Sequence, residues 1–220
     1  MHTGIGRDAA KLISLEIDML QKLRSGQLTL RQIEWWQGLS KEERDRLAGI
    51  TLLDGHFTLI RTFSVTVPLD YVHATRLETF KKKNEEKLHF FSIGITDENF
   101  RKSTKLEPGR KFTVRIFGQN ISGITTSDER MAFLQSKKAV LVGAQGASLV
   151  LEEKSQELPR GFSYCSFDEK NALWRNGDGY HRLPLINVSV AGDIDFDLGM
   201  FEKPWNSQVC MLCFTDEEEH

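Results

Sequence analysis

The chain has 220 residues, with 29 basic and 31 acidic side chains, a formal net charge of -2 and 40% hydrophobic residues. These values are ordinary for a water-soluble globular protein and exclude a disordered chain, a collagen-like repeat, a coiled-coil rod and a strongly cationic nucleic-acid binder. The longest stretch without Asp, Glu, Lys or Arg, residues 139–151, is too short and too polar to cross a bilayer. We therefore expect a soluble protein with no membrane partner.

Compartment is indicated by the first residues and by the cysteines. Residues 1–8 lack the basic and apolar regions of a secretory signal, and they carry no transit or lipidation pattern. Three cysteines, an odd number in a chain of this length, do not suggest a disulfide framework. We expect a reducing, cytoplasmic environment.

Residues 8–49 predict three short helices. Apolar residues recur at helical spacing over 9–23, Thr29 and Gln32 form a capping box for a second helix that ends at Gly38, and a third helix follows from residue 40. Trp35 and Trp36 are neighbours on the second helix, about 100° apart, so one can be a core residue and the other a partner contact.

The second and third helices also invite a helix-turn-helix interpretation. The start of the third helix would then face phosphates, but it carries Glu42, Glu43 and Asp45 beside Lys41. Carboxylates there would be repelled by DNA. A small packing or oligomerisation module is the better interpretation.

From His56 the apolar period changes to two, which predicts a strand ending at Pro68. Its apolar residues are expected on one face: Phe57, Leu59, Phe63, Val65 and Val67. Further expected elements are a helix over 71–83 capped by Asp70, a strand over 88–95, a helix over 97–103, a strand over 112–117, a helix from 126 or 127 to 137, a strand over 140–142, a helix over 147–154, and strands over 162–167, 185–190, 194–198 and 209–214, with a hairpin turn at 176–179. The fold class is α+β: a helical segment, 1–52, packed on a mixed, mainly antiparallel sheet with interspersed helices in a domain spanning 53–220.

The hairpin at 174–182 gathers acid, base and aromatic groups. Its candidate contact residues are Trp174, Asp178, His181 and Arg182. A ligand or partner contact is one interpretation and ordinary surface decoration another, while a catalytic role for His181 requires a hydrogen-bonded partner.

Residues 140–147 outline a strand, a glycine-rich turn and a helix start, a pattern that presents N–H groups to an anion. Gly143 and Gly146 are the candidate anion-binding positions. The stretch lacks the full dinucleotide fingerprint and the lysine of a P-loop, so glycines that permit a tight turn are the alternative.

Metal and cofactor sites have little support. Cys210 and Cys213 lie on a predicted strand, where residues three apart point to opposite faces, so with Cys165 they are expected to be core thiols. The alternating aspartates of 193–197 share one strand face that could hold a cation but more often faces water. We predict no metal and no cofactor.

Charge is uneven along the chain. Residues 51–160 carry a formal charge of +4 and residues 161–220 carry -7. Between 80 and 111, basic residues alternate with Phe80, Phe90, Phe91 and Phe100, a composition used for stacking single-stranded nucleic acid. Interspersed carboxylates favour a solvated face instead.

Four stretches carry a resemblance to an uncharacterised family of small bacterial proteins: ITDENFRKSTKLEPGRKFTVRIF (95–117), KAVLVGAQGASLVLE (138–152), LPRGFSYCSFDEKNALWRNGDGYHRLPLI (158–186) and VCMLCFTD (209–216). It covers most of 95–216 and, more loosely, the helical start. The resemblance implies a bacterial, cytoplasmic protein and transfers no activity, ligand or functional residue.

The sequence therefore favours a non-catalytic binding or interaction protein whose partner is another protein or a second copy of itself. The expected contact surfaces are the helix of Trp35 and Trp36 and the hairpin at 174–182. One alternative is a nucleic-acid-associated protein that uses the basic middle segment. The other is an enzyme with a site near residues 143–146 or His181.

Overall fold

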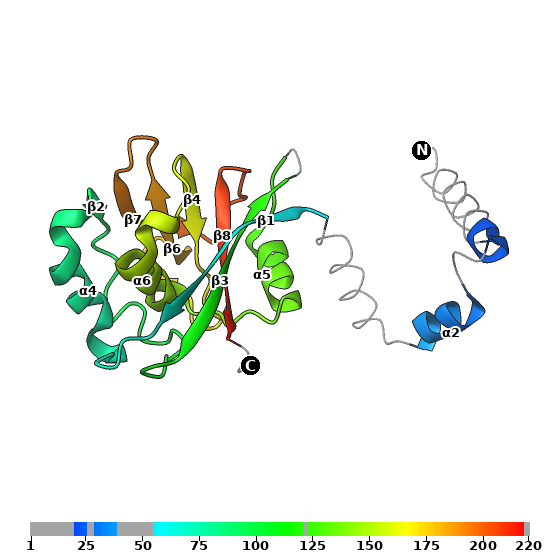
Figure 1. The fold of residues 1–220 in the computed structure, drawn as a ribbon, viewed down its shortest axis with the longest axis horizontal. Helices are drawn as coiled ribbons and strands as arrows, with labels where there is room; N and C mark the ends of the chain where they lie inside the picture. The colour runs from blue at the N-terminus through cyan, green and yellow to red at the C-terminus, as the bar shows by residue number, and fades with distance from the viewer. Residues whose placement is uncertain (1–19, 26–28, 39–54, 121–122, 218–220) are drawn as a thin grey trace. The chain divides into compact units, whose positions relative to one another are not determined.

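The computed structural model describes residues 20–25, 29–38, 55–120 and 123–217, and the chain divides into two units, Met1–Ala48 and Gly49–His220 (Figure 1). In the first unit, the predicted second helix is present as α2 (Leu30–Gly38), and residues 20–24 are helical. The predicted third helix and the predicted boundary at 52/53 lie outside the described residues, as do the side chains of Trp35 and Trp36. The packing of residues 1–52 on the sheet stays a prediction.

The second unit is built on one eight-stranded sheet with the order β1-β3-β8-β4-β6-β7-β2, in which β5 also pairs with β6. The strands are β1 (Phe57–Thr66), β2 (Phe90–Phe91), β3 (Lys111–Gln119), β4 (Phe162–Cys165), β5 (Trp174–Arg175), β6 (His181–Val188), β7 (Ile194–Met200) and β8 (Val209–Asp216). Among these strands, the β4–β8 and β2–β7 pairs are parallel and the others are antiparallel. The prediction of a mixed sheet with interspersed helices is confirmed for this unit.

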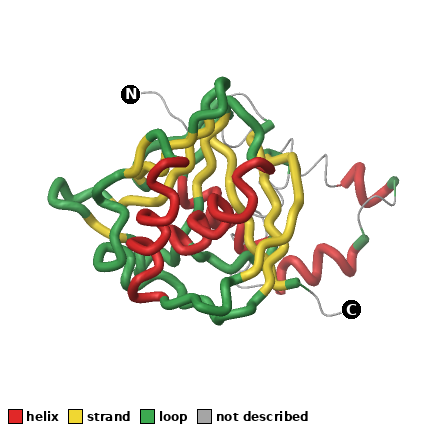
Figure 2. Tube along the Cα trace, turned by 60° about the vertical axis from the view of Figure 1, so that its left-hand side comes forward, coloured by secondary structure: helices red, strands yellow, loops and turns green. Residues whose placement is uncertain are grey.

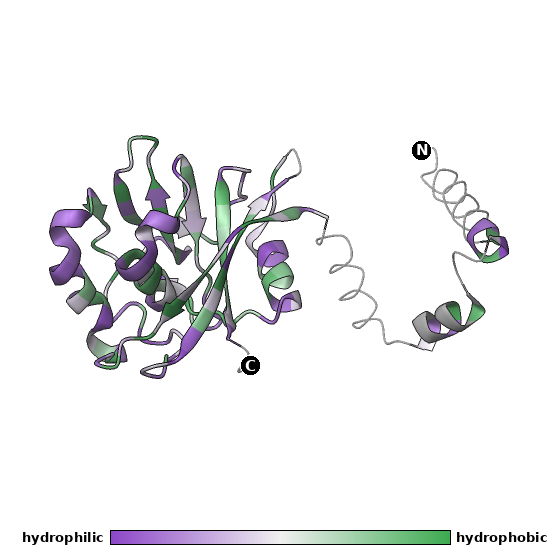
Figure 3. Ribbon diagram, in the orientation of Figure 1, coloured by the Kyte–Doolittle hydropathy of each residue, from purple (hydrophilic) through white to green (hydrophobic). Residues whose placement is uncertain are grey.

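Helices cover both faces of the sheet (Figures 1 and 2). On one face lie α4 (Arg76–Asn84) and α6 (Gly143–Lys154), and the cluster of buried apolar residues between them and the sheet is called the α6 core. Three short 3₁₀ turns lie next to these helices in the chain: η1 (His73–Thr75), η2 (Glu85–Lys87) and η3 (Ser155–Glu157). On the other face, α5 (Ser127–Ser136) covers the α5 core. Figure 3 shows hydrophilic residues over much of α4 and hydrophobic ones along the central strand β8.

Successive side chains of strand β8 alternate between the two cores. Cys210, Leu212 and Phe214 are buried in the α6 core, whereas Met211 and Cys213 are buried in the α5 core. The central strand is thus apolar on both sides because helices cover both sides. The prediction that the two β8 cysteines point to opposite faces is confirmed.

Strand β1 departs from its predicted alternation. Leu59 pairs with Phe117 and Arg61 with Ile116, so Ile60 is an extra residue in a β-bulge. Because of the extra residue, side chains before and after the bulge point to opposite faces of the sheet. Phe57 is buried in the α5 core, whereas the apolar residues near the other end of β1 pack in the α6 core. The prediction that these apolar side chains share one face is wrong for this reason.

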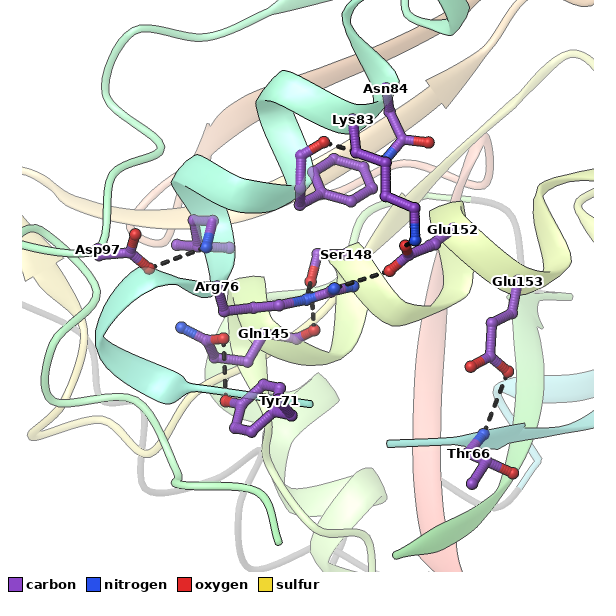
Figure 4. Close-up of polar contacts among 12 residues, drawn as sticks. Thr66, Tyr71, Arg76, Lys83, Asn84, Asp97, Gln145, Ser148, Glu152 and Glu153 are labelled. Atoms are coloured by element: carbon purple, nitrogen blue, oxygen red, sulfur yellow. Dashed lines mark hydrogen bonds and ion pairs between the residues drawn. The ribbon is translucent and has the colours of Figure 1, made fainter. Parts of the chain in front are cut away.

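The helix predicted over 71–83 starts later than expected. Its first part is η1, and α4 begins at Arg76. In the first turn of α4, the amides of Leu77 and Glu78 donate to the carboxylate of Asp97 at 2.8 and 3.1 Å. Figure 4 shows Asp97 beside this helix start. Asp97 therefore satisfies this helix start, and the prediction that Asp70 caps it is wrong.

Helix α6 starts earlier than expected, at Gly143 rather than Ala147. The predicted glycine-rich turn is therefore the first turn of the helix. The strand expected over 140–142 is reduced to one bridge between Val140 and Phe214. Likewise, the strand expected over 88–95 is reduced to β2, and residues 97–103 form turns instead of a helix.

Helix α5 begins as predicted. The Thr126 side chain accepts from the amide of Glu129, and the Glu129 carboxylate accepts from the amide of Thr126, which completes a capping box. No helix among the described residues is long and apolar enough to cross a membrane.

Arg130, a charged residue of α5, is fully buried. Its guanidinium donates to the carbonyls of Val209 and Asn206, at 2.7 and 3.2 Å, and to the hydroxyl of Thr125 at 2.8 Å. Because a buried cation requires such partners, this side chain ties α5 to the loop before β8 and to the start of that strand.

Candidate functional site

The predicted hairpin is present. Strands β5 and β6 pair Trp174 with Arg182 and Arg175 with His181. Asp178, in the turn, lies 2.8 Å from the guanidinium of Arg182. The turn is therefore held by an ion pair between an exposed carboxylate and a guanidinium whose side chain is only 14% exposed.

His181 faces a carboxylate and an aromatic ring. Its Nδ1 lies 2.6 Å from Oε1 of Glu202, and its ring meets the edge of Phe201. Burial acts to raise the pKa of Glu202, but the hydrogen bonds from the His181 side chain and backbone hold that pKa below its usual range. The two side chains form a hydrogen-bonded pair at the surface, beside the α5 core.

Trp174 lies on the other side of the hairpin. Its indole packs against Phe100, with ring centroids 6.2 Å apart, and it borders the α6 core. A Cβ on Gly94 would come within 3.0 Å of this indole, so Trp174 is seated directly on that glycine. The hairpin thus presents Trp174 and His181 to different surroundings.

Trp174 forms one wall of a cavity of about 300 Å³, which we call the Trp174 pocket. The polar and aromatic residues that line it are Glu98, Asn99, Arg101, Lys102, Trp174 and Arg175. Three of them are cations and one is a carboxylate. Glu98 pairs with Arg101 at 2.8 Å, which leaves the charges of Lys102 and Arg175 in excess. The pocket therefore joins the predicted hairpin to part of the predicted basic segment.

The candidate anion-binding glycines are enclosed. Gly143 and Gly146 are both buried in α6, and their amides donate to the carbonyls of Phe167 and Val142. A Cβ on Gly146 would come within 2.2 Å of the Val142 side chain. Neither position has room for a Cβ, so packing constrains both glycines. The tight turn that was the alternative interpretation is replaced by the first turn of α6.

Gly143 also makes room for a carboxyl group that the sequence did not single out. A Cβ on Gly143 would lie 1.8 Å from Oδ2 of Asp168, and the backbone there has a φ of 43°. Asp168 is fully buried, and among the described residues it accepts one hydrogen bond, from Oγ of Ser103 at 3.0 Å. Burial raises the pKa of Asp168 to about 7, although the Ser103 hydrogen bond acts to lower it. Its position directly after a predicted strand was the one sequence feature that could have marked it.

A second polar cluster lies between α4 and α6 (Figure 4). Arg76 extends from α4 toward α6, where its Nε donates to Oγ of Ser148 at 2.9 Å and its Nη1 lies 2.7 Å from Oε2 of Glu152. Lys83 pairs with the other oxygen of Glu152. Burial acts to raise the pKa of Glu152, but the hydrogen bonds from Lys83 and Arg76 lower it. The Glu152 carboxylate thus forms ion pairs with both Arg76 and Lys83.

Beside this cluster, the hydroxyl of Tyr71 donates to Oε1 of Gln145 at 3.1 Å and lies 2.9 Å from Nδ1 of His73. Burial raises the pKa of Tyr71 to about 12 and lowers the pKa of His73.

Tyr71 and Arg76 also line a cavity of about 290 Å³, which we call the α4–α6 cavity. Thr75, Thr79, Lys83 and Glu152 are among its other lining residues. Neither Gly143, Gly146 nor His181 lines this cavity or the Trp174 pocket. No sequence pattern marks this cluster, because the partners that meet across the α4–α6 interface are 69 or more residues apart in the chain.

The aromatic side chains of the basic segment are mostly not available for stacking. Phe80 and Phe100 are buried in the α6 core, and Phe91 packs against it, whereas Phe90 is exposed. Arg110 is engaged in an ion pair with Asp216 at 2.7 Å. A continuous aromatic and basic surface for single-stranded nucleic acid is therefore absent from residues 80–111.

Cysteines 165, 210 and 213 are free and buried, and burial raises the pKa of each thiol. Within the described part of the chain, no three His, Cys, Asp or Glu side chains are grouped so that they could hold a metal ion. Of the alternating aspartates, Asp195 pairs with His89 at 2.9 Å and Asp193 accepts from Ser189 at 3.0 Å.

Comparisons with protein-family models, with curated proteins and with solved structures find no match. The resemblance to small bacterial proteins therefore stays an expectation, and the function has to be argued from the geometry alone.

Proposed function

We propose that the protein is a non-catalytic binding protein, and that the Trp174 pocket takes an acidic segment of a partner protein. The observation that carries this proposal is the convergence of Trp174 with Arg101, Lys102 and Arg175 around one cavity. These residues come from two regions, the hairpin and the basic segment, that are about 70 positions apart in the chain.

The chemistry of the pocket fits an acidic side chain next to an apolar one. Lys102 and Arg175 are exposed cations at its rim, and the half-buried indole of Trp174 offers a flat apolar wall. Aromatic and arginine side chains are the residues that contribute most at protein interfaces. Electrostatic complementarity of this kind sets specificity and association rate.

An acidic protein segment is favoured over nucleic acid because Phe80 and Phe100, two of the four expected stacking residues, are buried in the α6 core. Base stacking supplies a large share of single-strand affinity, so their burial removes that contribution. The enzyme alternative is less favoured because neither His181 nor Gly143 lines the Trp174 pocket or the α4–α6 cavity. The helix of Trp35 and Trp36 is kept as a second proposed contact surface.

The test is fluorescence anisotropy of a labelled hexaglutamate peptide titrated with the full chain. The titration is done at about 20 and about 150 mM NaCl, where the Debye length is longer and shorter than about 10 Å, respectively. Lys102→Glu is the variant, and Lys87→Glu, an exposed lysine of the same segment outside the pocket, is the matched control. Reversing one pocket charge should weaken binding about five- to tenfold, equivalent to about 1 kcal/mol or slightly more, while the control should stay within about twofold.

Two results would overturn the proposal. One is the lack of peptide binding at high micromolar protein in low salt. The other is equal weakening by Lys102→Glu and Lys87→Glu, which would assign the binding to general charge. A labelled oligonucleotide that binds more tightly than the peptide, with both variants weakened, would support the nucleic-acid alternative instead.

A further inference from the structure

The longest run of consecutive carboxylates in the chain, residues 216–219, begins at the last residue of β8. The Nε and Nη2 of Arg110 donate to the carboxylate of Asp216 at 2.7 and 3.0 Å, so this first side chain is already paired. The Glu217 carboxylate, in contrast, forms no ion pair with a described residue. The three glutamates that follow Asp216 are called the 217–219 segment.

Two cations of the Trp174 pocket have no carboxylate partner among the described residues. Lys102 forms no ion pair there, and Arg175 uses only its Nε, in a hydrogen bond to a backbone carbonyl at 2.8 Å. A third cation, Arg101, is paired with Glu98, but both side chains are exposed, so this pair contributes little and can exchange for another carboxylate. The pocket and the 217–219 segment therefore have complementary charges.

The 217–219 segment is too short to enter the pocket of its own chain. The amide of Glu217 donates to the carbonyl of Lys111 at 3.3 Å, which holds the start of the segment to β3. A Cβ on Gly94 would contact both Trp174 and Leu198, so the pocket wall lies beside β7.

In the sheet order, β7 is three strands away from β8. Three spacings of about 4.8 Å amount to about 14 Å, whereas the two residues after Glu217 extend at most about 7 Å. A second copy of the chain is therefore needed to bring a 217–219 segment to the pocket.

We propose that the Trp174 pocket of one copy binds the 217–219 segment of a second copy, so that the chain associates with itself. The inference rests on the proposed function, because it names the acidic segment that the pocket takes. The glutamates pair with Lys102 and Arg175 at the rim, and the contact is electrostatic and sensitive to salt.

The first experiment measures self-association of the full chain by sedimentation velocity, at about 10 to 500 μM protein and at about 20 and about 150 mM NaCl. The wild type should associate with rising concentration in low salt and less in high salt. The test variant combines Glu217→Gln, Glu218→Gln and Glu219→Gln. The matched control removes the same number of carboxylates at exposed positions elsewhere, through Glu85→Gln, Glu86→Gln and Glu107→Gln.

Both triple variants have the same net charge, so a difference between them reports the position of the carboxylates. The dissociation constant should rise at least about tenfold in the 217–219 variant and stay within about twofold in the control. Lys102→Glu should weaken self-association as well, whereas Lys87→Glu should not.

The second experiment mixes two variants that are each deficient in self-association. Lys102→Glu keeps the 217–219 segment and lacks a working pocket, whereas the 217–219 variant keeps the pocket and lacks the segment. A mixture of the two, with one of them fluorescently labelled, should associate because each supplies what the other lacks.

Three outcomes contradict the inference. One is a wild type that stays monomeric at about 500 μM in low salt, far above the concentration that a weak specific contact requires. Another is equal association of the two triple variants, which would assign the contact to a different surface, such as the helix of Trp35 and Trp36. The third is a mixture that associates no better than its components.

These failures can be told apart from failure of the proposed function. If hexaglutamate does not bind, the pocket does not take acidic segments and both proposals fall. If hexaglutamate binds and Lys102→Glu weakens that binding, but the 217–219 variant associates as the wild type does, only the inference about the second copy falls.

Discussion

Asp168 makes the stability of the folded protein depend on pH, and Asp168→Asn isolates that dependence. The carboxyl group is fully buried, packs against Gly143, and accepts a hydrogen bond from Ser103 alone among the described residues. Burial raises its pKa from 3.8 to about 7. The folded protein therefore keeps a proton on Asp168 at pH values where the unfolded chain has released it.

The sign follows from this difference in proton binding. Because the folded state binds the proton more tightly, the contribution of Asp168 to stability is fully present below about pH 4 and is lost as the pH rises to about 7. A shift of roughly three pH units corresponds to about 4 kcal/mol once both states are ionised. Between pH 5 and pH 8, the part of this loss that falls in the window is about 2–3 kcal/mol.

Asparagine cannot ionise and still offers a carbonyl oxygen to Ser103. The free energy of unfolding of Asp168→Asn, relative to wild type, should therefore rise by about 2–3 kcal/mol from pH 5 to pH 8. Urea titrations at the two pH values, followed by circular dichroism, measure it. Glu107→Gln, at an exposed position, is the control and should show no such rise. Parallel behaviour of Asp168→Asn and wild type across this range would refute the reasoning.

Three further substitutions test the packing. Gly143→Ala should destabilise the fold by more than about 3 kcal/mol, because its Cβ would lie 1.8 Å from a carboxylate oxygen and the backbone there has a positive φ. Gly177→Ala, with open space around it, is the control and should cost no more than about 1 kcal/mol. Similar melting temperatures of the two variants would contradict this. Arg130→Met should cost about 3 kcal/mol or more in urea unfolding, since it strands several buried acceptors, and a loss below about 1 would disprove their importance. Thr126→Ala should cost about 1 kcal/mol through the lost cap, and an unchanged urea midpoint would rule that out.

Elements set by local chemistry were predictable from the sequence. The capping box of Thr126 and Glu129 places the start of α5, and the alternation along 209–214 places β8 with its cysteines on opposite faces. The hairpin at 174–182 follows from its Asn-Gly-Asp-Gly turn. Each depends on residues within a few positions of one another.

Elements set by distant residues were not predictable. The start of α4 depends on Asp97, about 20 positions downstream, and the first turn of α6 depends on space beside the Asp168 carboxyl group. The same reason hid the candidate sites. Trp174 meets Lys102, and Arg76 meets Ser148, only because the strand order of the sheet brings those segments together.

The bulge in β1 makes the length of this strand more important than the identity of its extra residue. Ile60 has no partner on β3 and lies over Gly118, so other side chains can occupy its place at the exposed edge. Deleting that residue is a different event, because a one-residue slip turns every following or preceding side chain to the opposite face. Phe57 would then leave the α5 core, or Val65 the α6 core. We therefore expect the strand to tolerate substitution of residue 60 but not its deletion.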